Sequence, residues 1–314
     1  MPKALSPLFP LEGLFALIKP SGPASMILLD RLKPLFNESP LFRKRRKDAV
    51  KIGQGGTLDP LADGVLVIGV NKGTKSLANF LNCTKEYYTT ALLGCETDSY
   101  DSQGARVRTA PFSHVTREMI SGALGSFRGE ISQLPPIYSA LKMDGKPLYE
   151  YARNGLALPR PIEPRKVTIH SLELVDWKEG RGPGIAGHNF KWPEKTLNAE
   201  DIAAIDRIRM LVAEAASGPP AFTLKMVVSS GTYVRSIVHD LAHAIGSAAH
   251  VVTLTRTRQG DFGVGPNDDL YGGDCVPWEV FEKALEDRDR ETHVADGEHD
   301  EWEKVLLAKW HPPS

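Results

Sequence analysis

The chain has 314 residues, of which 41% are hydrophobic and 25% are charged, and its formal net charge is −1. This balance is typical of a globular protein and excludes an intrinsically disordered chain. The charge also excludes a chain that is basic overall, so a nucleic acid would have to bind to a local basic surface. The three cysteines are far apart and lack metal-ligand spacing, which favours a reducing compartment over a disulfide or zinc framework.

The N-terminal region and the apolar runs give no targeting signal. No apolar run approaches the length of a membrane-spanning helix. Residues 1–17 contain a single Lys and no cleavage-site pattern, so we expect no secretory signal. They contain no Arg, which disfavours a transit peptide.

Short apolar or β-rich runs predict strands along the whole chain. The expected strands are Leu14–Ile18, Val65–Val70, Tyr87–Leu93, Val167–Trp177, Phe222–Val228 and Ala249–Thr255.

Two segments have helical periodicity. Thr116–Leu124 predicts a helix with Thr116 as its N-cap, and its apolar face would consist of Met119, Ile120, Ala123 and Leu124. Tyr233–Ile245 is the best amphipathic helix, and Gly246 is the expected stop. Because helices and strands do not alternate regularly, the fold class should be α+β and not doubly wound.

We interpret residues 1–286 as one domain, with insertions near 37–48 and 178–220. The first insertion contains the basic run Arg43–Lys47, which is consistent with a solvated loop, a nuclear address or a phosphate contact. The second is rich in Gly and Pro at both ends, with a helical stretch at 201–216. Residues 287–314 form an acidic C-terminal tail that could end in a final helix.

The most informative stretch is residues 53–66, Gly-Gln-Gly-Gly-Thr-Leu-Asp-Pro-Leu-Ala-Asp-Gly-Val-Leu. Small, turn-forming residues present the carboxylate of Asp59, and the chain then enters an apolar strand. Glycines allow another molecule to approach the backbone closely, and Pro60 stiffens the turn. From these residue types alone, Asp59 is either a site residue or an ordinary turn residue.

This stretch resembles the catalytic loop of the TruB family of tRNA pseudouridine synthases, and further motifs follow in the family's order. These are Lys19–Gly22, Lys85–Tyr87, Pro135–Lys142, Gly145–Arg153, Ser230–Ser236 and Leu254–Arg256. The eukaryotic branch, which makes pseudouridine 55 in the tRNA T-loop, is the most similar. The resemblance implies a pseudouridine synthase fold, with a central mixed, mainly antiparallel sheet flanked by helices and loops. We find no pattern for the PUA domain that the family often carries.

The resemblance implies that Asp59 is the catalytic residue of an isomerase. Breaking a C–N glycosidic bond and forming a C–C bond to the same sugar carbon oxidises nothing, so no cofactor and no metal are expected. The carboxylate acts either as nucleophile or as base. Arg235 resembles the arginine that pairs with this carboxylate, and Asp101 resembles an acid that holds the arginine. A nearby cation would favour the ionised carboxylate.

The resemblance also implies an apolar and aromatic wall around the flipped base. Tyr87 matches the tyrosine that stacks on the uracil, Tyr233 a second tyrosine near the pocket, and Leu254 a residue that packs beside the base. Composition alone favours ordinary packing for all three, because aromatic and apolar side chains mostly serve the core.

Basic and aromatic residues interleave from Ser139 to Arg165, which suits a folded RNA loop. The resemblance makes this the segment that clamps the T-loop, with Lys142, Lys146 and Arg153 as RNA contacts. A solvated amphipathic helix is the alternative. Gln54 stands where bacterial members usually have His, and we expect a role in base flipping and RNA binding.

Other interpretations of the sequence are open. His239 and His243 lie four residues apart on a predicted helix, as in zinc hydrolases, but no convincing third ligand follows. Residues 69–76 resemble a phosphate loop only loosely. A module that binds or folds tRNA without catalysis is the non-enzymatic alternative, although Asp59, Tyr87 and Arg235 are all present.

The expected partner is tRNA, or RNA with a similar loop, bound by a monomer. The resemblance suggests a nuclear or mitochondrial enzyme.

Overall fold

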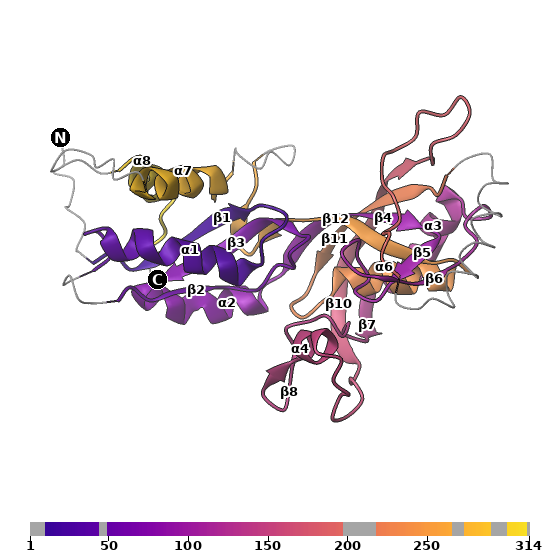
Figure 1. Cartoon of the computed structure of the whole chain (residues 1–314), viewed down its shortest axis with the longest axis horizontal. Helices are drawn as coiled ribbons and strands as arrows, with labels where there is room; N and C mark the ends of the chain where they lie inside the picture. The colour runs from indigo at the N-terminus through magenta and orange to yellow at the C-terminus, as the bar shows by residue number, and fades with distance from the viewer. Residues whose placement is uncertain (1–9, 44–48, 197–217, 266–272, 290–299, 313–314) are drawn as a thin grey trace. The chain divides into compact units, whose positions relative to one another are not determined.

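The structure is a computed structural model that describes residues 10–43, 49–196, 218–265, 273–289 and 300–312 (Figure 1). The chain folds into two compact units. The first unit combines Met1–Lys85 with Thr255–Ser314, and the second is Glu86–Leu254. The first unit is therefore built from both ends of the sequence.

The first unit contains a mixed sheet in the order β14-β1-β3-β12. The pairing is antiparallel between β1 and β3 and between β2 and β3, and parallel between β1 and β14 and between β3 and β12. The strands are β1 (Gly13–Lys19), β2 (Ile52–Gln54), β3 (Asp63–Val70), β13 (Phe262–Gly263), β14 (Cys275–Pro277) and the end of β12 (Ala249–Gln259).

The helices of the first unit are α1 (Ser25–Glu38), η1 (Asn71–Ser76), α2 (Leu77–Asn82), α7 (Trp278–Asp289) and α8 (Glu301–Ala308). Aromatic rings connect α1, α7 and α8 with the sheet. Phe36 of α1 stacks on Phe15 of β1 at 5.8 Å between ring centroids and lies 5.4 Å from Trp302 of α8. Phe281 of α7 lies 5.9 Å from Phe15. These rings pack β1 and α1 against α7 and α8.

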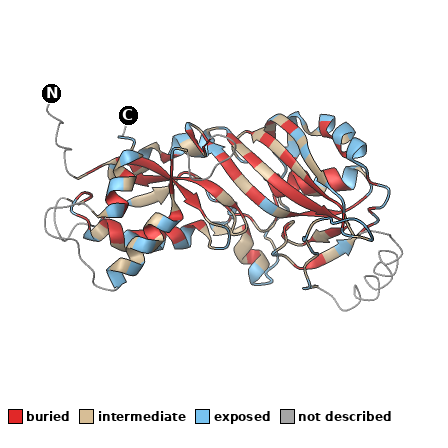
Figure 2. Ribbon diagram, turned by 90° about the horizontal axis from the view of Figure 1, so that it is seen from above, coloured by how far each residue is buried: buried red, intermediate tan, exposed pale blue. Residues whose placement is uncertain are grey.

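The second unit contains the strand order β12-β4-β11-β10-β7. Both β11 and β7 pair with β10 in antiparallel register, and Figure 2 shows buried residues concentrated along the strands. The strands are β4 (Lys85–Leu93), β7 (Gly129–Gln133), β10 (Arg165–Lys178), β11 (Ala221–Val228) and the start of β12.

Shorter elements complete the second unit. The hairpin β5–β6 lies near α3 and α6 in Figure 1. The elements are β5 (Cys95–Thr97), β6 (Arg106–Thr109), α3 (Arg117–Ala123), η2 (Leu124–Phe127), β8 (Lys142–Met143), β9 (Lys146–Pro147), α4 (Leu148–Arg153) and α6 (Val234–Ala244).

The α+β class and the mixed sheet confirm the predicted fold class. The predicted strands correspond to β1, β3, β4, β10, β11 and β12, and the predicted helices to α3 and α6. Thr116 caps α3 by accepting a hydrogen bond from the Met119 backbone N–H at 3.3 Å. Met119 itself is 38% exposed, so its assignment to the apolar face was wrong.

Some features differ from the sequence-based expectation. α1 was not predicted, and it contains Pro34, a residue that usually disfavours helix interiors. β12 continues past Thr255 to Gln259 because the polar side chains of Arg256 and Gln259 are buried and hydrogen-bonded there.

The helical stretch expected at 201–216 and most of the basic run lie outside the described residues. Among the helices that the structure describes, none is long and apolar enough to cross a membrane.

Candidate active site

The loop between β2 and β3 carries Asp59, and the residue before it is firmly anchored. The Leu58 side chain is 3% exposed. The Ser25 hydroxyl donates to the Leu58 carbonyl at 2.9 Å, and its oxygen accepts from the Leu58 N–H at 3.0 Å. Because these bonds fix the backbone of Leu58, they also fix where the Asp59 backbone begins.

A buried lysine holds the other side of Asp59. The Lys19 ammonium at the end of β1 donates to the carbonyls of Pro20 at 2.9 Å, Pro60 at 3.2 Å and Ala62 at 2.6 Å. Burial lowers the pKa of Lys19 to about 8, while the charges of Asp63 and Asp59 oppose that shift. Lys19 is therefore a cation whose field reaches the candidate catalytic carboxylate.

The turn after Lys19 adds further backbone bonds to the same loop. The Gly22 N–H donates to the Pro60 carbonyl at 2.8 Å, and the Ser21 hydroxyl donates to the Leu61 carbonyl at 2.7 Å. The Ala62 N–H donates a hydrogen bond to the Asp59 carbonyl at 3.1 Å. The motif Lys19–Gly22 thus acts as a brace for the Asp59 loop.

Where the loop enters β3, the chain passes close to β12. Gly64 has φ +98°, and a Cβ there would lie 2.3 Å from the Arg256 carbonyl oxygen, so only glycine fits. The Arg256 guanidinium donates to the Val65 carbonyl at 2.7 Å. The Gln259 amide donates to the carbonyls of Gly55 and Phe80. Buried polar side chains of β12 therefore position both ends of the loop.

Gln54 lies at the start of this loop. Its amide nitrogen donates to the Thr57 hydroxyl oxygen at 3.1 Å and lies 3.8 Å from the Met26 sulfur. Its amide oxygen is buried and has no hydrogen-bond partner among the residues that the structure describes. The side chain is thus oriented by the loop that carries Asp59.

In the second unit, Arg235 is placed by the first turn of α6 and is 3% exposed. Its guanidinium donates to the carbonyls of Ser99 and Tyr138, the latter at 2.8 Å, and lies 3.8 Å from the Asp101 carboxylate. Asp101 accepts from the Ser99 hydroxyl at 2.7 Å and from the Gln103 N–H at 3.0 Å. The structure therefore brings Arg235 and Asp101 together as the resemblance implies.

The apolar site candidates come from three elements of the second unit. Tyr87 on β4 is 8% exposed and Leu254 on β12 is 5% exposed. Tyr233 precedes α6 and is half-buried. The Gln133 side chain holds its backbone, accepting from the Tyr233 N–H at 2.8 Å and donating to its carbonyl at 2.9 Å. Tyr87 and Leu254 also serve as packing residues.

The expected RNA clamp consists of the hairpin β8–β9 and α4, and two of its cations, Lys146 and Arg153, lie over tyrosine rings. The Lys146 ammonium lies 5.1 Å from the Tyr151 ring centroid, and the Arg153 guanidinium 5.1 Å from the Tyr149 ring centroid. Lys142 is exposed. Since α4 spans only Leu148–Arg153, most of this basic segment is not a helix.

Sequence reasoning missed the residues that hold the site. It assigned no role to Lys19, Ser25, Gln133 or Gln259, although each binds the backbone next to a predicted site residue. Lys19 lies in a motif that carried the resemblance, which was the available signal. Gln54 and Asp59 belong to the first unit, and the other predicted site residues to the second.

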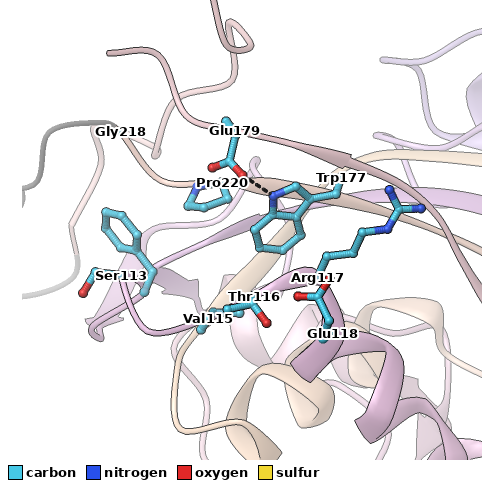
Figure 3. Close-up of a pocket in the computed structure, with 10 residues that line it drawn as sticks. Ser113, Val115, Thr116, Arg117, Glu118, Trp177, Glu179, Gly218 and Pro220 are labelled. Carbon is cyan, nitrogen blue, oxygen red and sulfur yellow. Dashed lines mark hydrogen bonds between the residues drawn. The ribbon is translucent and has the colours of Figure 1, made fainter. Parts of the chain in front are cut away.

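A cavity of about 430 Å³ lies elsewhere, in the second unit, and Figure 3 shows its lining. Trp177 forms one wall and donates through its indole N–H to Glu179 at 2.7 Å, with Thr116, Arg117 and Pro220 nearby. None of the predicted site residues lines this cavity.

Comparison with known proteins places these features in one family. Residues 44–185 match the model of the TruB family pseudouridylate synthase N-terminal domain. A tRNA pseudouridine synthase 4 of Schizosaccharomyces pombe is 36% identical, and the match covers 80% of this chain and 79% of that protein. Pseudouridylate synthase TRUB1 of Mus musculus is 39% identical over 81% of this chain and 65% of that protein.

A tRNA pseudouridine synthase B of Aromatoleum aromaticum is 37% identical over 81% of this chain and 69% of that protein. A solved structure described as "Crystal Structure of a Cbf5-Nop10-Gar1 Complex" superposes with a TM-score of 0.55 at 21% identity, over 96% of this chain and 60% of that one, and supports the fold alone. The chain is a pseudouridine synthase by class. It belongs to the TruB family.

Proposed function

We propose that this chain converts uridine 55 in the T-loop of tRNA to pseudouridine, flipping the base and using Asp59 to cleave and re-form the glycosidic bond. The observation that carries the proposal is the bracing of Asp59, whose neighbours are held by Ser25 and Lys19. The names of the relatives support tRNA as the substrate, since several are called tRNA pseudouridine synthases.

The reaction is an isomerisation, so its atoms balance without a co-reactant. The bond from N1 of uracil to the sugar carbon breaks, the base turns, and its C5 bonds to the same carbon. C5 then loses its proton and N1 gains one, so the product has the same atoms as the substrate. An ionised Asp59 would act either as a nucleophile on the sugar or as a base on a neighbouring proton. Both roles require a well-positioned carboxylate, and the bracing fixes the backbone from which the Asp59 side chain extends.

Tyr87, Tyr233 and Leu254 are proposed to hold the flipped uracil, and Arg235 to stabilise the ionised Asp59. A flipped base is commonly stacked against aromatic or apolar side chains. Asp101 would act indirectly, because it lies beside Arg235 and holds the guanidinium. Lys142, Lys146 and Arg153 would bind phosphates of the T-arm, and Gln54 would assist base flipping.

The direct test is to incubate the purified protein with an unmodified tRNA transcript and to map pseudouridine at single-nucleotide resolution. The expected product has pseudouridine at position 55 and nowhere else, and a transcript with cytidine at 55 stays unmodified. Tight binding of tRNA without any pseudouridine would instead support the non-catalytic alternative, a module that binds or folds tRNA.

A further inference from the structure

A cluster of ionisable side chains in the second unit is not used by the proposed reaction. His239 and His243 lie one turn apart on α6, Glu96 is on β5, and Arg108 is on β6. The His243 Nε2 atom is 2.8 Å from Glu96 Oε2, and the His239 Nδ1 atom is 3.7 Å from Glu96 Oε1. One atom from each of Glu96, His239 and His243 lies within 4.8 Å of the others.

The hydrogen-bonding groups of this cluster do not all have suitable partners. The His239 Nδ1 atom is buried and, within the described part of the chain, has no hydrogen-bond partner, although it faces a carboxylate. The His243 Nε2 atom contacts both Glu96 Oε2 and Arg108 Nη2, at 2.8 and 2.9 Å. A neutral imidazole nitrogen either donates or accepts, so it cannot satisfy an acceptor and a pure donor together.

The ring of His239 is already fixed in orientation. The Tyr100 ring stacks on it at 4.0 Å between centroids with an interplanar angle of 15°. Its position on α6, one turn before His243, gives the i, i+4 spacing by which two imidazoles reach one ion. The ligand set is therefore largely prearranged.

We propose that Glu96, His239 and His243 bind one divalent ion of the zinc class, with water completing the coordination. Two imidazoles and a carboxylate are a common ligand set for zinc. The third ligand, which the sequence around the histidines does not supply, comes from the hairpin β5–β6. Ligand bonds of roughly 2.0–2.2 Å require the three side chains to draw together slightly.

Arg108 would compete with the ion. Its guanidinium donates to Glu96 at 2.9 Å and lies 2.9 Å from His243 Nε2, and it also donates to the Ser247 carbonyl at 3.1 Å. The ion must displace the guanidinium from Glu96 and His243, while the bond to Ser247 offers it another partner. Arg108 thus lowers the affinity of the site without being part of it.

The role of such an ion would be structural. His239 is one turn after Arg235 on α6, and Glu96 precedes the turn that carries Asp101. An ion bound between α6 and the hairpin would fasten together the two segments that supply the Arg235–Asp101 pair. Because the ion binds the folded chain, it should raise the thermal midpoint to a degree set by its concentration and affinity.

The test uses the full chain without a purification tag, stripped of metal, and titrated with Zn²⁺ by calorimetry and with Co²⁺ by visible absorption. We expect one ion per chain and a cobalt spectrum typical of a four-coordinate site. Glu96→Gln and His243→Ala should each weaken binding by at least about tenfold. Arg108→Met should tighten it, and the matched control His170→Ala, an exposed histidine on β10, should change nothing.

Circular dichroism of every variant shows whether weaker binding comes from a lost ligand or from a misfolded chain. Arg108→Met should raise the affinity for the ion, which misfolding cannot do. Absence of binding in both the wild type and Arg108→Met would overturn the proposal. So would equal affinities in the wild type and His243→Ala, or an affinity of Arg108→Met no higher than that of the wild type.

Discussion

The guanidinium of Arg235 lies 3.8 Å from the carboxylate of Asp101, and both side chains are almost completely buried. A buried charge is costly unless charges and hydrogen bonds surround it. Arg235 also donates to the carbonyls of Ser99 and Tyr138, and Asp101 accepts from the Ser99 hydroxyl and the Gln103 N–H. The pair therefore ties the start of α6 to two loops of the second unit.

Replacing Asp101 by Asn should destabilise the protein, because Arg235 would keep its buried charge and lose the opposing one. The free energy of unfolding should fall by about 3 kcal/mol, as for other buried pairs that lose one partner. Urea unfolding followed by circular dichroism measures this change. The matched control is Glu130→Gln, which removes an exposed partner of Lys166 and should cost far less, because water screens an exposed ion pair. Equal losses in the two variants would contradict this account of the pair.

Because of Lys19, the free energy of unfolding should change with pH in the range above pH 7. Its pKa is about 8 in the folded protein and 10.5 in the reference state, so between these values the unfolded chain binds more protons. Stability should therefore rise with pH across that window, by at most about 3 kcal/mol. Lys19→Met removes this contribution. Urea unfolding at pH 7.5 and pH 10 should give a steeper rise for the wild type, whereas identical rises would show that Lys19 does not titrate there.

The basic clamp should control affinity for tRNA more than the rate of the reaction. Alanine at Lys142, Lys146 and Arg153 together should weaken binding and reduce the slope of log affinity against log salt by about 2–3, since each lost phosphate contact removes roughly 0.7–0.9. The rate at saturating tRNA should fall less than the affinity. Filter binding at several salt concentrations measures the slope.

The control for the clamp is alanine at Lys33, Lys166 and Lys178, three exposed cations outside the hairpin β8–β9 and α4. It removes the same net charge. If both triple variants changed the salt slope equally, the effect would come from net charge and not from a clamp.

Catalysis should not need a metal, because an isomerisation driven by a carboxylate requires no Lewis acid. Protein treated with a chelator, dialysed and supplied with tRNA prefolded in Mg²⁺ should keep its kcat/KM within about twofold. Its thermal midpoint should nevertheless rise when Zn²⁺ is added. If the chelator lowered kcat/KM and added Zn²⁺ restored it, the ion would act on the reaction and not only on the stability of the protein.

Sequence patterns predicted the main strands and the helices α3 and α6 because their apolar periodicity matches the faces that are buried. They could not predict β12 beyond Thr255, where Arg256 and Gln259 are buried and donate hydrogen bonds to backbone carbonyls of β3 and α2, which are distant in sequence. α1 was missed because it contains Pro34. Lysine is almost never fully buried, so composition gave no reason to place Lys19 beneath the Asp59 loop.

The candidate site was only partly predictable for a similar reason. The resemblance indicated Asp59, Arg235 and Asp101, but residues that hold the Asp59 loop and Arg235, such as Ser25 and Ser99, are distant from them in sequence. Ser25 and Leu58, for example, are separated by 33 residues, and only folding brings the Ser25 hydroxyl to 2.9 Å from the Leu58 carbonyl. The motif Lys19–Gly22 was the available signal for one brace, whereas the roles of Ser25, Gln133 and Gln259 depend on tertiary contacts that leave no local pattern.

The central claim is that one braced carboxylate, Asp59, carries the isomerisation, and Asp59→Asn tests it most directly. Single-turnover assays with unmodified tRNA should show pseudouridine formation at least about 1,000-fold slower, while tRNA affinity stays within a few-fold, because many separate contacts hold the RNA. The control Asp30→Asn, which changes an exposed partner of Lys33, should react at the wild-type rate. A rate for Asp59→Asn near that of the wild type would contradict the account.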